Sequence, residues 1–303
     1  MNDTGIVVIG GGMAAYALAR EFRKLEPETP FTIVSADDGA VYAKPMLSNA
    51  LAQNKTADAL VQKDAARAAQ DLAITVRSQA RVTRIGRDTR QIEIDSNGTS
   101  ESMAYTRLVL ATGATPRACP VAAHGVPVAT VNSLDDYRRW RANLKDNDTV
   151  LLIGAGLIGT EFANDLASSG HAVVLTDPAP WPLSRLLPEP LGRLLSEALS
   201  CAGVEVICGH GVSALQSNGA RATVMLDDGR RVGFDKALSA IGLVPNTGLA
   251  AAAGLSVDQG IVVDAYSRTD DPAIFALGDC AQTAVGLLPY VSPMLASARA
   301  MAR

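Results

Sequence analysis

The sequence has 303 residues and a formal net charge of −4, and 48% of its residues are hydrophobic while only 4% are aromatic. This length suits two domains, or three small ones. The mild charge, without a long basic block, argues against nucleic-acid binding. No apolar run is long enough to span a bilayer, and no basic stretch precedes the short N-terminal one. We therefore expect a cytoplasmic protein without direct membrane insertion.

The cysteines and histidines show no metal-binding pattern. No two of the four cysteines form a CxxC pair, and none has a metal-ligand spacing with the three histidines. We expect no metal site, and we interpret the cysteines as small, buried or partly buried residues. They are Cys119, Cys201, Cys208 and Cys280.

The first part of the chain predicts a βαβ unit followed by further strands. A strand, a glycine turn, a helix and a second strand come first, then an alternating stretch with an Asn97-Gly98 turn, then a buried strand. The expected ranges are 5–9, 13–25, 31–39, 71–100 and 107–117.

The same pattern is repeated from about residue 131. Ser133 is a candidate cap for a helix over 133–144, with Asp135 and Asp136 in its first turn. Residues 149–177 then repeat the strand, glycine turn, helix and strand. A buried strand (238–246), a strand-and-loop stretch (260–282) and an amphipathic helix (293–303) follow. The chain thus predicts an α/β protein with two Rossmann-like dinucleotide-binding domains.

The first glycine turn has the pattern G-x-G-x-x-A at Gly10, Gly12 and Ala15. The first glycine allows a tight turn, the second lets the backbone approach a pyrophosphate, and the alanine allows close packing of helix on strand. The acid that normally ends the second strand is missing at the expected position, Ala36. Asp37 or Ser35 can take its role; alternatively, Asp37 and its neighbour Asp38 are ordinary turn residues.

The second turn is a full G-x-G-x-x-G at Gly154, Gly156 and Gly159. Asp177 ends the next strand, 23 residues after Gly154. An acid at this place accepts hydrogen bonds from ribose hydroxyls and repels a 2′-phosphate, which favours NADH over NADPH. The alternative is a turn acid beside Pro178.

Several stretches together resemble a known family. "IFALGDCA" (274–281) ends a nearly apolar strand with Asp279 and, with "LATGATPR" (110–117), resembles the flavin motif of reductases with two dinucleotides. "YAKPMLSNAL", "GAGLIGTEFANDL", "SAIGLVPN" and "LLPYVSP" resemble the NADH-dependent rubredoxin reductases of bacterial alkane oxidation and, less closely, the ferredoxin reductases of oxygenase systems.

The resemblance implies a glutathione-reductase-like architecture, in which an NADH domain is inserted into an FAD domain. Residues 1–117 and 245–303 would bind FAD, and residues 118–244 would bind NADH. Relatives continue into a further C-terminal α/β domain, which we expect this chain to lack.

The missing dithiol narrows the implied reaction. Glutathione-reductase-like relatives carry CxxxxC after the first βαβ unit, where this sequence has "VYAKPMLSN". Electrons would then leave directly from the flavin to a one-electron protein, rubredoxin. The alternatives are a [2Fe–2S] ferredoxin or flavorubredoxin as the acceptor, or a redox-sensing module with negligible turnover. A peroxide- or disulfide-reducing enzyme would need a reactive cysteine, and Cys280 has no partner cysteine in the sequence.

The resemblance also implies roles for individual residues. Lys44, before Pro45, would lie near the hydride-accepting edge of the flavin and stabilise its reduced form, with Glu161 as its partner. Alternatively, Lys44 is a solvated loop lysine and Glu161 an ordinary acid at a helix start. The full set of expected cofactor contacts is Gly10, Gly11, Gly12, Met13, Ala14, Ser35, Ala36, Asp37, Lys44, Pro45, Val82, Thr112, Gly113, Gly154, Gly156, Ile158, Gly159, Glu161, Asp177, Gly242, Asp279 and Val291.

Two basic features have open interpretations. Arg117 is either a phosphate partner or an exposed arginine. Five arginines recur within 14 residues and form either a docking surface for an acidic acceptor or one solvated strand face. They are Arg77, Arg81, Arg84, Arg87 and Arg90.

Overall fold

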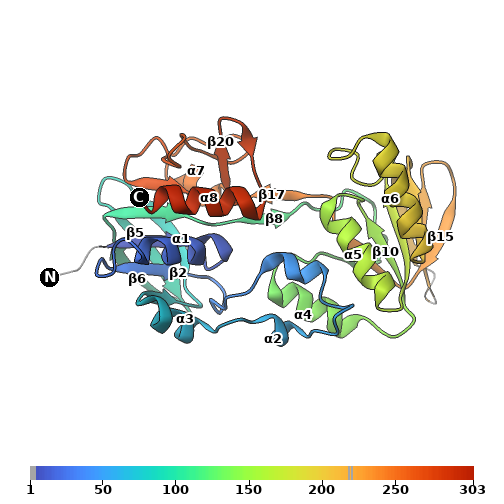
Figure 1. Ribbon diagram of the computed structural model, residues 1–303, viewed down its shortest axis with the longest axis horizontal. Helices are drawn as coiled ribbons and strands as arrows, with labels where there is room; N and C mark the ends of the chain where they lie inside the picture. The colour runs from blue at the N-terminus through green and yellow to red at the C-terminus, as the bar shows by residue number, and fades with distance from the viewer. Residues whose placement is uncertain (1–4, 218, 220) are drawn as a thin grey trace. The chain divides into compact units, whose positions relative to one another are not determined.

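The computed structural model describes residues 5–217, 219 and 221–303, which fold as two compact units. The first unit comprises Met1–Tyr42, Val61–Thr115 and Val244–Arg303, and the second comprises Ala43–Leu60 and Pro116–Leu243. The chain passes between the units along β8 (Ala114–Pro116) and β17 (Leu243–Pro245), which pair with each other. Figure 1 labels elements from both units.

The first unit is built on a five-stranded parallel sheet. Most of its strands are apolar and partly β-branched, as suits strands that are covered on both faces. In spatial order they are β19 (Ile274–Ala276), β7 (Arg107–Leu110), β1 (Ile6–Ile9), β2 (Phe31–Val34) and β3 (Thr75–Arg77).

Different layers cover the two faces of this sheet. Val8 and Val109 belong to the core that packs on helices, whereas Val7 and Leu108 belong to the core under a three-stranded antiparallel sheet. Figure 1 shows α1 and α8 lying side by side. The covering elements are α1 (Met13–Arg23), α3 (Ala65–Leu72), α7 (Gly248–Ala252), α8 (Val291–Met301), β4 (Arg81–Gly86), β5 (Gln91–Ser96) and β6 (Thr99–Ala104), beside the small sheet of β18 (Ile261–Val262), β20 (Ala281–Thr283) and β21 (Gly286–Leu287).

The second unit repeats this three-layer plan. Its parallel sheet has helices on one face and an antiparallel three-stranded sheet on the other. The parallel strands in order are β12 (Val204–Cys208), β11 (Ala172–Asp177), β10 (Thr149–Ile153), β16 (Lys236–Ser239) and β9 (Val128–Ala129). The remaining elements are η1 (Lys44–Ser48), α2 (Ala57–Leu60), α4 (Leu134–Asn143), α5 (Leu157–Ser168), α6 (Glu189–Cys201), β13 (Val212–Ser217), β14 (Ala222–Leu226) and β15 (Arg231–Phe234).

The predicted helix cap at Ser133 and the predicted turn at Asn97-Gly98 are both confirmed. Ser133 accepts a hydrogen bond from the backbone N–H of Asp136, and the Asp136 carboxylate accepts one from the backbone N–H of Ser133. Asn97 and Gly98 form the turn between β5 and β6. The alternating stretch begins later than expected, because residues 71 and 72 still belong to α3. Among the described residues, no helix has the length and apolar character needed to cross a membrane.

Candidate functional site

The first glycine turn leaves the start of α1 open. Gly10 has φ +114°, and a Cβ on it would overlap the carbonyl of Ala111. Gly12 is exposed, has no atom within 4 Å of where its Cβ would lie, and begins α1 without any side-chain cap. The positive end of the α1 dipole therefore lies next to an unobstructed position at Gly12, which suits a phosphate.

The residues after β2 lie against this turn. Gly10 donates its N–H to the Val34 carbonyl at 2.8 Å, so Ser35 is the residue that follows at the level of the turn. The buried Ser35 hydroxyl donates to Asp37 Oδ1 at 2.5 Å, and a Cβ on Gly11 would overlap the Ser35 hydroxyl. The exposed Asp37 carboxylate therefore lies beside Ser35 near the glycine turn, whereas Ala36 has no polar side chain.

Two further strand ends complete the same edge of the first sheet. Thr112 and Gly113 follow β7, and the Thr112 hydroxyl donates to the Asn246 carbonyl at 2.8 Å. Gly278, with φ +81°, follows β19 and would place a Cβ 3.1 Å from the Cβ of Ala14. Asp279 comes next and is half-buried. The carboxyl ends of parallel strands therefore gather these candidate FAD contacts at one edge.

The second turn has the same construction. Gly154 has φ +106°, and its Cβ would lie 2.7 Å from the Ala240 carbonyl oxygen. A Cβ on Gly159 would overlap the Gly154 carbonyl, whereas Gly156 is exposed with nothing within 4 Å of its Cβ position. Gly156 begins α5 without a side-chain cap, and the first turn of α5 contains no acid. The start of α5, which no side chain caps, therefore suits an anion.

Asp177 and Leu183 hold the middle of this turn. Asp177 Oδ2 accepts from the Ala155 N–H at 2.6 Å, and Asp177 Oδ1 accepts from the Ala179 N–H at 2.7 Å. The Leu183 N–H donates to the Ala155 carbonyl at 2.9 Å, although Leu183 has φ +58°. A leucine in this left-handed region is strained, so the contact with Ala155 outweighs that strain in this structure. No pattern in the sequence indicates this role of Leu183.

Lys44 and Glu161 both belong to the second unit. Lys44 is the first residue of η1 and is half-buried. It is not without an interaction partner. The hydroxyl of buried Ser48, at the end of η1, donates to Glu161 Oε2 at 2.6 Å. The structure therefore brings the Lys44–Ser48 turn against α5, where Glu161 lies. Pairing of Lys44 with Glu161 stays a prediction.

The other predicted contacts are scattered over the two units. In the first unit, Val82 packs partly against the core under the antiparallel sheet, and Val291 begins α8 with 37% of its surface exposed. In the second, Ile158 is exposed on the first turn of α5. Gly242 accepts a hydrogen bond from the N–H of Arg117, whose side chain is exposed. Their contact with a nucleotide remains a prediction.

The recurring arginines are partly neutralised by neighbouring acids. Arg77 pairs with Glu101, and Arg84 pairs with Glu93 at 2.8 Å. Arg87 donates to Asp271 at 3.0 Å and to the Gly254 carbonyl at 2.9 Å. These pairs favour a solvated, charge-balanced strand face over a docking surface.

The cysteine chemistry argues against a thiol mechanism. Burial raises the pKa of the Cys280 thiol, which lies 3.2 Å from the carbonyl oxygen of Leu110. Burial, with the nearby Asp177 carboxylate, raises the pKa of Cys208 to about 11. Both thiols therefore stay protonated at neutral pH and are weak nucleophiles.

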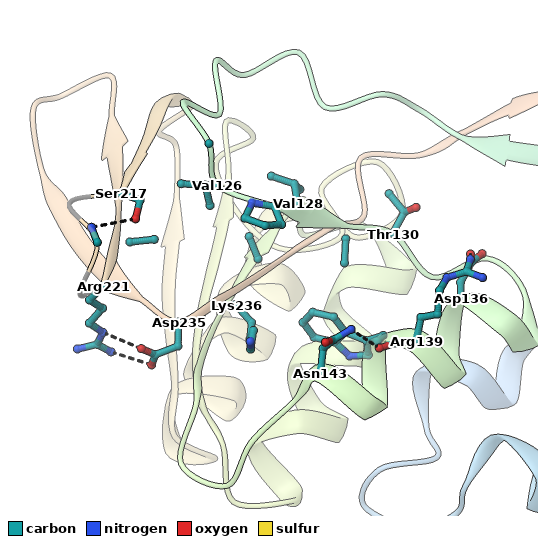
Figure 2. A pocket seen from close by; sticks show the side chains of 17 residues that line it. Val126, Val128, Thr130, Asp136, Arg139, Asn143, Ser217, Arg221, Asp235 and Lys236 are labelled. Carbon is teal, nitrogen blue, oxygen red and sulfur yellow. Dashed lines mark hydrogen bonds and ion pairs between the residues drawn. The ribbon is translucent and has the colours of Figure 1, made fainter.

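A cavity of about 710 Å³ lies in the second unit, away from the glycine turn. Figure 2 shows it beside β9, α4 and the start of β16, whose first residue, Lys236, pairs with Val150 near the start of β10. The Gly154 turn follows the opposite end of β10. Two of the basic side chains of the cavity already pair with acids, Arg221 with Asp235 and Arg139 with Asp136. We assign this cavity no role.

Three side chains that the sequence leaves unrelated also come together. His210 Nδ1 lies 3.1 Å from Asp227 Oδ1 and 3.4 Å from Asp228 Oδ2. Both carboxylates have other partners, the Gly211 N–H and the Arg230 guanidinium. The cluster is explained as a hydrogen-bonded turn, and we assign no metal to it.

Comparison with known proteins agrees with this geometry. Residues 4–301 match the family model "Pyridine nucleotide-disulphide oxidoreductase". The chain is 41% identical to the Rubredoxin-NAD(+) reductase of Acinetobacter baylyi, over 98% of this chain and 77% of that protein. It is 39% identical to the Nitric oxide reductase FlRd-NAD(+) reductase of Vibrio vulnificus, over 100% of this chain and 78% of that protein.

A solved structure gives the same result. The reductase in the covalent complex of putidaredoxin reductase with putidaredoxin superposes with a TM-score of 0.88 at 30% identity, over 98% of this chain and 74% of that chain. The resemblance inferred from the motifs is thereby confirmed. Since the family match spans nearly the whole sequence and the two open helix starts suit two dinucleotides, the chain belongs to the pyridine nucleotide-disulphide oxidoreductase family, which implies FAD and NADH as its cofactors.

Proposed function

We propose that this chain takes electrons from NADH and passes them through FAD to rubredoxin. The observation that carries the proposal is the pair of open glycine turns, one in each unit, without a cysteine pair to relay electrons. All four cysteines are free thiols. A carrier that accepts single electrons directly from a flavin suits this arrangement. The named Rubredoxin-NAD(+) reductase relative, at 41% identity, supports the same acceptor.

The first unit is the proposed FAD site. The start of α1 at Gly12 would hold the pyrophosphate, with Ser35 and Asp37 at the adenosine ribose. Asp279, after β19, would accept hydrogen bonds from the ribityl chain. The predicted FAD domain has the bounds 1–117 and 245–303, and the predicted NADH domain spans 118–244. The structure differs for residues 43–60, which it groups with the second unit.

The second unit is the proposed NADH site. The start of α5 at Gly156 would hold the NADH pyrophosphate. Asp177 already accepts two backbone hydrogen bonds, yet each carboxylate oxygen has a further lone pair for a ribose hydroxyl. Its negative charge would repel a 2′-phosphate, which supports NADH as the preferred nucleotide.

Lys44 and Glu161 are the proposed catalytic residues. When bound, NADH and FAD would supply the redox chemistry: a hydride would pass to the flavin, its two electrons would leave one at a time, and its proton would be released to solvent. Lys44 would place a positive charge beside the flavin and stabilise the negative charge that it gains. Glu161, held by the Ser48 hydroxyl at 2.6 Å, would orient that lysine.

The proposal also names the pathway in which the enzyme acts and the acceptor protein that it reduces. We assign the enzyme to alkane hydroxylation in the cytoplasm, following the resemblance of its motifs. A flavorubredoxin acceptor is the second candidate, because the chain is also 39% identical to the Nitric oxide reductase FlRd-NAD(+) reductase of Vibrio vulnificus. A [2Fe–2S] ferredoxin is a third, supported by the likeness to putidaredoxin reductase.

Anaerobic rapid mixing tests the reaction in two steps. Adding NADH to the FAD-loaded protein should bleach the visible flavin absorbance, and adding oxidised rubredoxin should then restore it. Lys44→Ala should retain FAD but slow the bleaching. Bleaching that no rubredoxin, flavorubredoxin or ferredoxin reverses would contradict the proposal and favour a redox-sensing module.

A further inference from the structure

Asp165, on α5, is a buried carboxylate that accepts hydrogen bonds from the backbone of another segment. Among residues 5–217, 219 and 221–303, it is the one Asp or Glu that is buried, with 2% of its surface exposed. Its two oxygens accept hydrogen bonds from the backbone N–H groups of Leu51 (3.0 Å) and Ala52 (2.8 Å). Burial raises the pKa of this carboxyl, although these hydrogen bonds act in the opposite direction. A charge is costly in such surroundings unless it is hydrogen-bonded, so the two hydrogen bonds from Leu51 and Ala52 stabilise the charged form of Asp165.

Helix α4 holds the same segment a few residues further on. The Tyr137 hydroxyl donates to the Lys55 carbonyl at 3.0 Å. Arg141 donates to that carbonyl at 2.8 Å and to the Asn54 side chain at 3.0 Å. All these contacts lie within the second unit, and Leu51 packs against its helix-side core. Residues 51–55 are therefore fastened to both α4 and α5.

This fastened segment directly follows the Lys44–Ser48 turn. Ser48 donates to Glu161 Oε2 at 2.6 Å, and Leu51 and Ala52 donate to Asp165. Glu161 and Asp165 are four residues apart on α5, so their side chains lie on one face, one turn apart. Two neighbouring carboxylates thus fix the register of the Lys44–Ser48 turn along α5.

We propose that Asp165 is a positioning residue, which locks the Lys44–Ser48 turn onto α5 and thereby sets the position of Lys44 for hydride transfer. The Lys44 turn, although it comes early in the chain, is then a fixed part of the nicotinamide-binding unit. The side chain of Asp165 interacts with the backbone of residues 50–52 and with the charge of Arg141, and none of its described contacts involves the Gly154–Gly159 turn. This inference rests on the proposed function for the role of Lys44.

Asp165→Asn tests the lock with little change of size. The amide offers one acceptor oxygen, and its NH₂ group faces a second N–H, so one of the two hydrogen bonds is lost. Hydrogen exchange measured by mass spectrometry should show residues 50–55 exchanging roughly tenfold faster or more. Asp165→Ala should give a larger effect on the same peptide. The exchange rates of peptides from the first unit should be unchanged.

The kinetic readout separates positioning from binding. The rate of flavin bleaching at saturating NADH should fall by roughly tenfold in Asp165→Asn, because a small misplacement of a catalytic group has a large effect. The affinity for NADH, measured by titration with NAD⁺, should stay within about twofold, since the Gly154 turn is intact. Ser48→Ala should slow bleaching without faster exchange at residues 51 and 52.

Asp235→Asn is the matched control. Asp235 also accepts a hydrogen bond from a backbone N–H, that of Thr149, at 2.8 Å in the second unit, but none of its described interactions involves residues 51–55. It should retain wild-type bleaching. Unchanged exchange of residues 50–55 in Asp165→Asn, or equal slowing in Asp235→Asn, would overturn the inference. If wild-type flavin is not bleached by NADH at all, the proposed function fails, and the exchange result still decides whether Asp165 locks the turn.

Discussion

Replacing Gly156 with alanine should separate nucleotide binding from folding. Gly156 has φ −73° and ψ −175°, which alanine adopts freely, and nothing lies within 4 Å of the new Cβ. Its neighbour Gly159 is the contrasting case. There, a Cβ would overlap the Gly154 carbonyl and lie 3.3 Å from the Cβ of Ala240. The same chemical change thus meets open space at one glycine and packed atoms at the other.

The magnitudes follow from these surroundings. For Gly156→Ala, a gain of about 0.4–1 kcal/mol from restricting the unfolded chain is offset by a similar loss because alanine is a poor N-cap. The melting temperature should therefore change by less than about 2 °C. A Cβ that displaces the phosphate from the helix start removes a charge-assisted hydrogen bond of about 1.5–3 kcal/mol, so NADH should bind roughly tenfold to 150-fold more weakly. Gly159→Ala should destabilise the fold by about 1–3 kcal/mol.

Calorimetric titration with NAD⁺ and thermal unfolding followed by circular dichroism measure the two effects. Gly12→Ala in the first unit serves as the paired control, because its Cβ also meets open space. That variant should lose FAD and keep its affinity for NAD⁺. A Gly156→Ala protein that binds NAD⁺ as tightly as the wild type would refute the placement of the pyrophosphate at α5.

Three further changes test separate parts of the site. Asp177→Asn removes a negative charge at the ribose position, and the ratio of kcat/KM for NADPH to that for NADH should rise by about tenfold or more; an unchanged ratio would remove Asp177 from nucleotide selection. Leu183→Pro cannot reach φ +58° or donate to Ala155, so it should lower both the melting temperature and the affinity for NAD⁺, whereas wild-type affinity would mean that the Ala155 contact does not shape the turn. The folded Asp165 carboxyl has a pKa raised above its ordinary 3.8, so it binds its proton more tightly than the unfolded carboxyl does. Its contribution should make the free energy of unfolding fall as pH rises from about 3.8 through the raised pKa. The difference in unfolding free energy between the wild type and Asp165→Asn, measured with urea, should therefore fall over this pH range, and a difference that is independent of pH would contradict the raised pKa.

Local patterns in the sequence predict the two nucleotide turns well, because each glycine has a local reason to be there. The turns need positive φ at Gly10 and Gly154 and an unobstructed helix start at Gly12 and Gly156. The cap at Ser133 is equally local. Such features depend on residues a few positions apart, so their spacing in the sequence is sufficient to predict them.

The contacts that hold the Lys44 turn could not be predicted in this way. Ser48 and Glu161 are 113 residues apart, and neither Ser48 nor Asp165 stands in a motif that indicates its partner. The contact of Leu183 with Ala155 likewise depends on a strained backbone that leucine does not signal. The same limit applies to the acid after β2, where strand register brings Ser35 and Asp37, and not Ala36, to the glycine turn.

The central claim is the acceptor, and NADH-driven cytochrome c reduction tests it most directly. Rubredoxin and a [2Fe–2S] ferredoxin are added in equal amounts to separate reactions with the FAD-loaded protein. Strong stimulation by rubredoxin and little by ferredoxin is the expected result. Stimulation by ferredoxin alone would contradict the claim and assign the chain to the reductases of oxygenase systems.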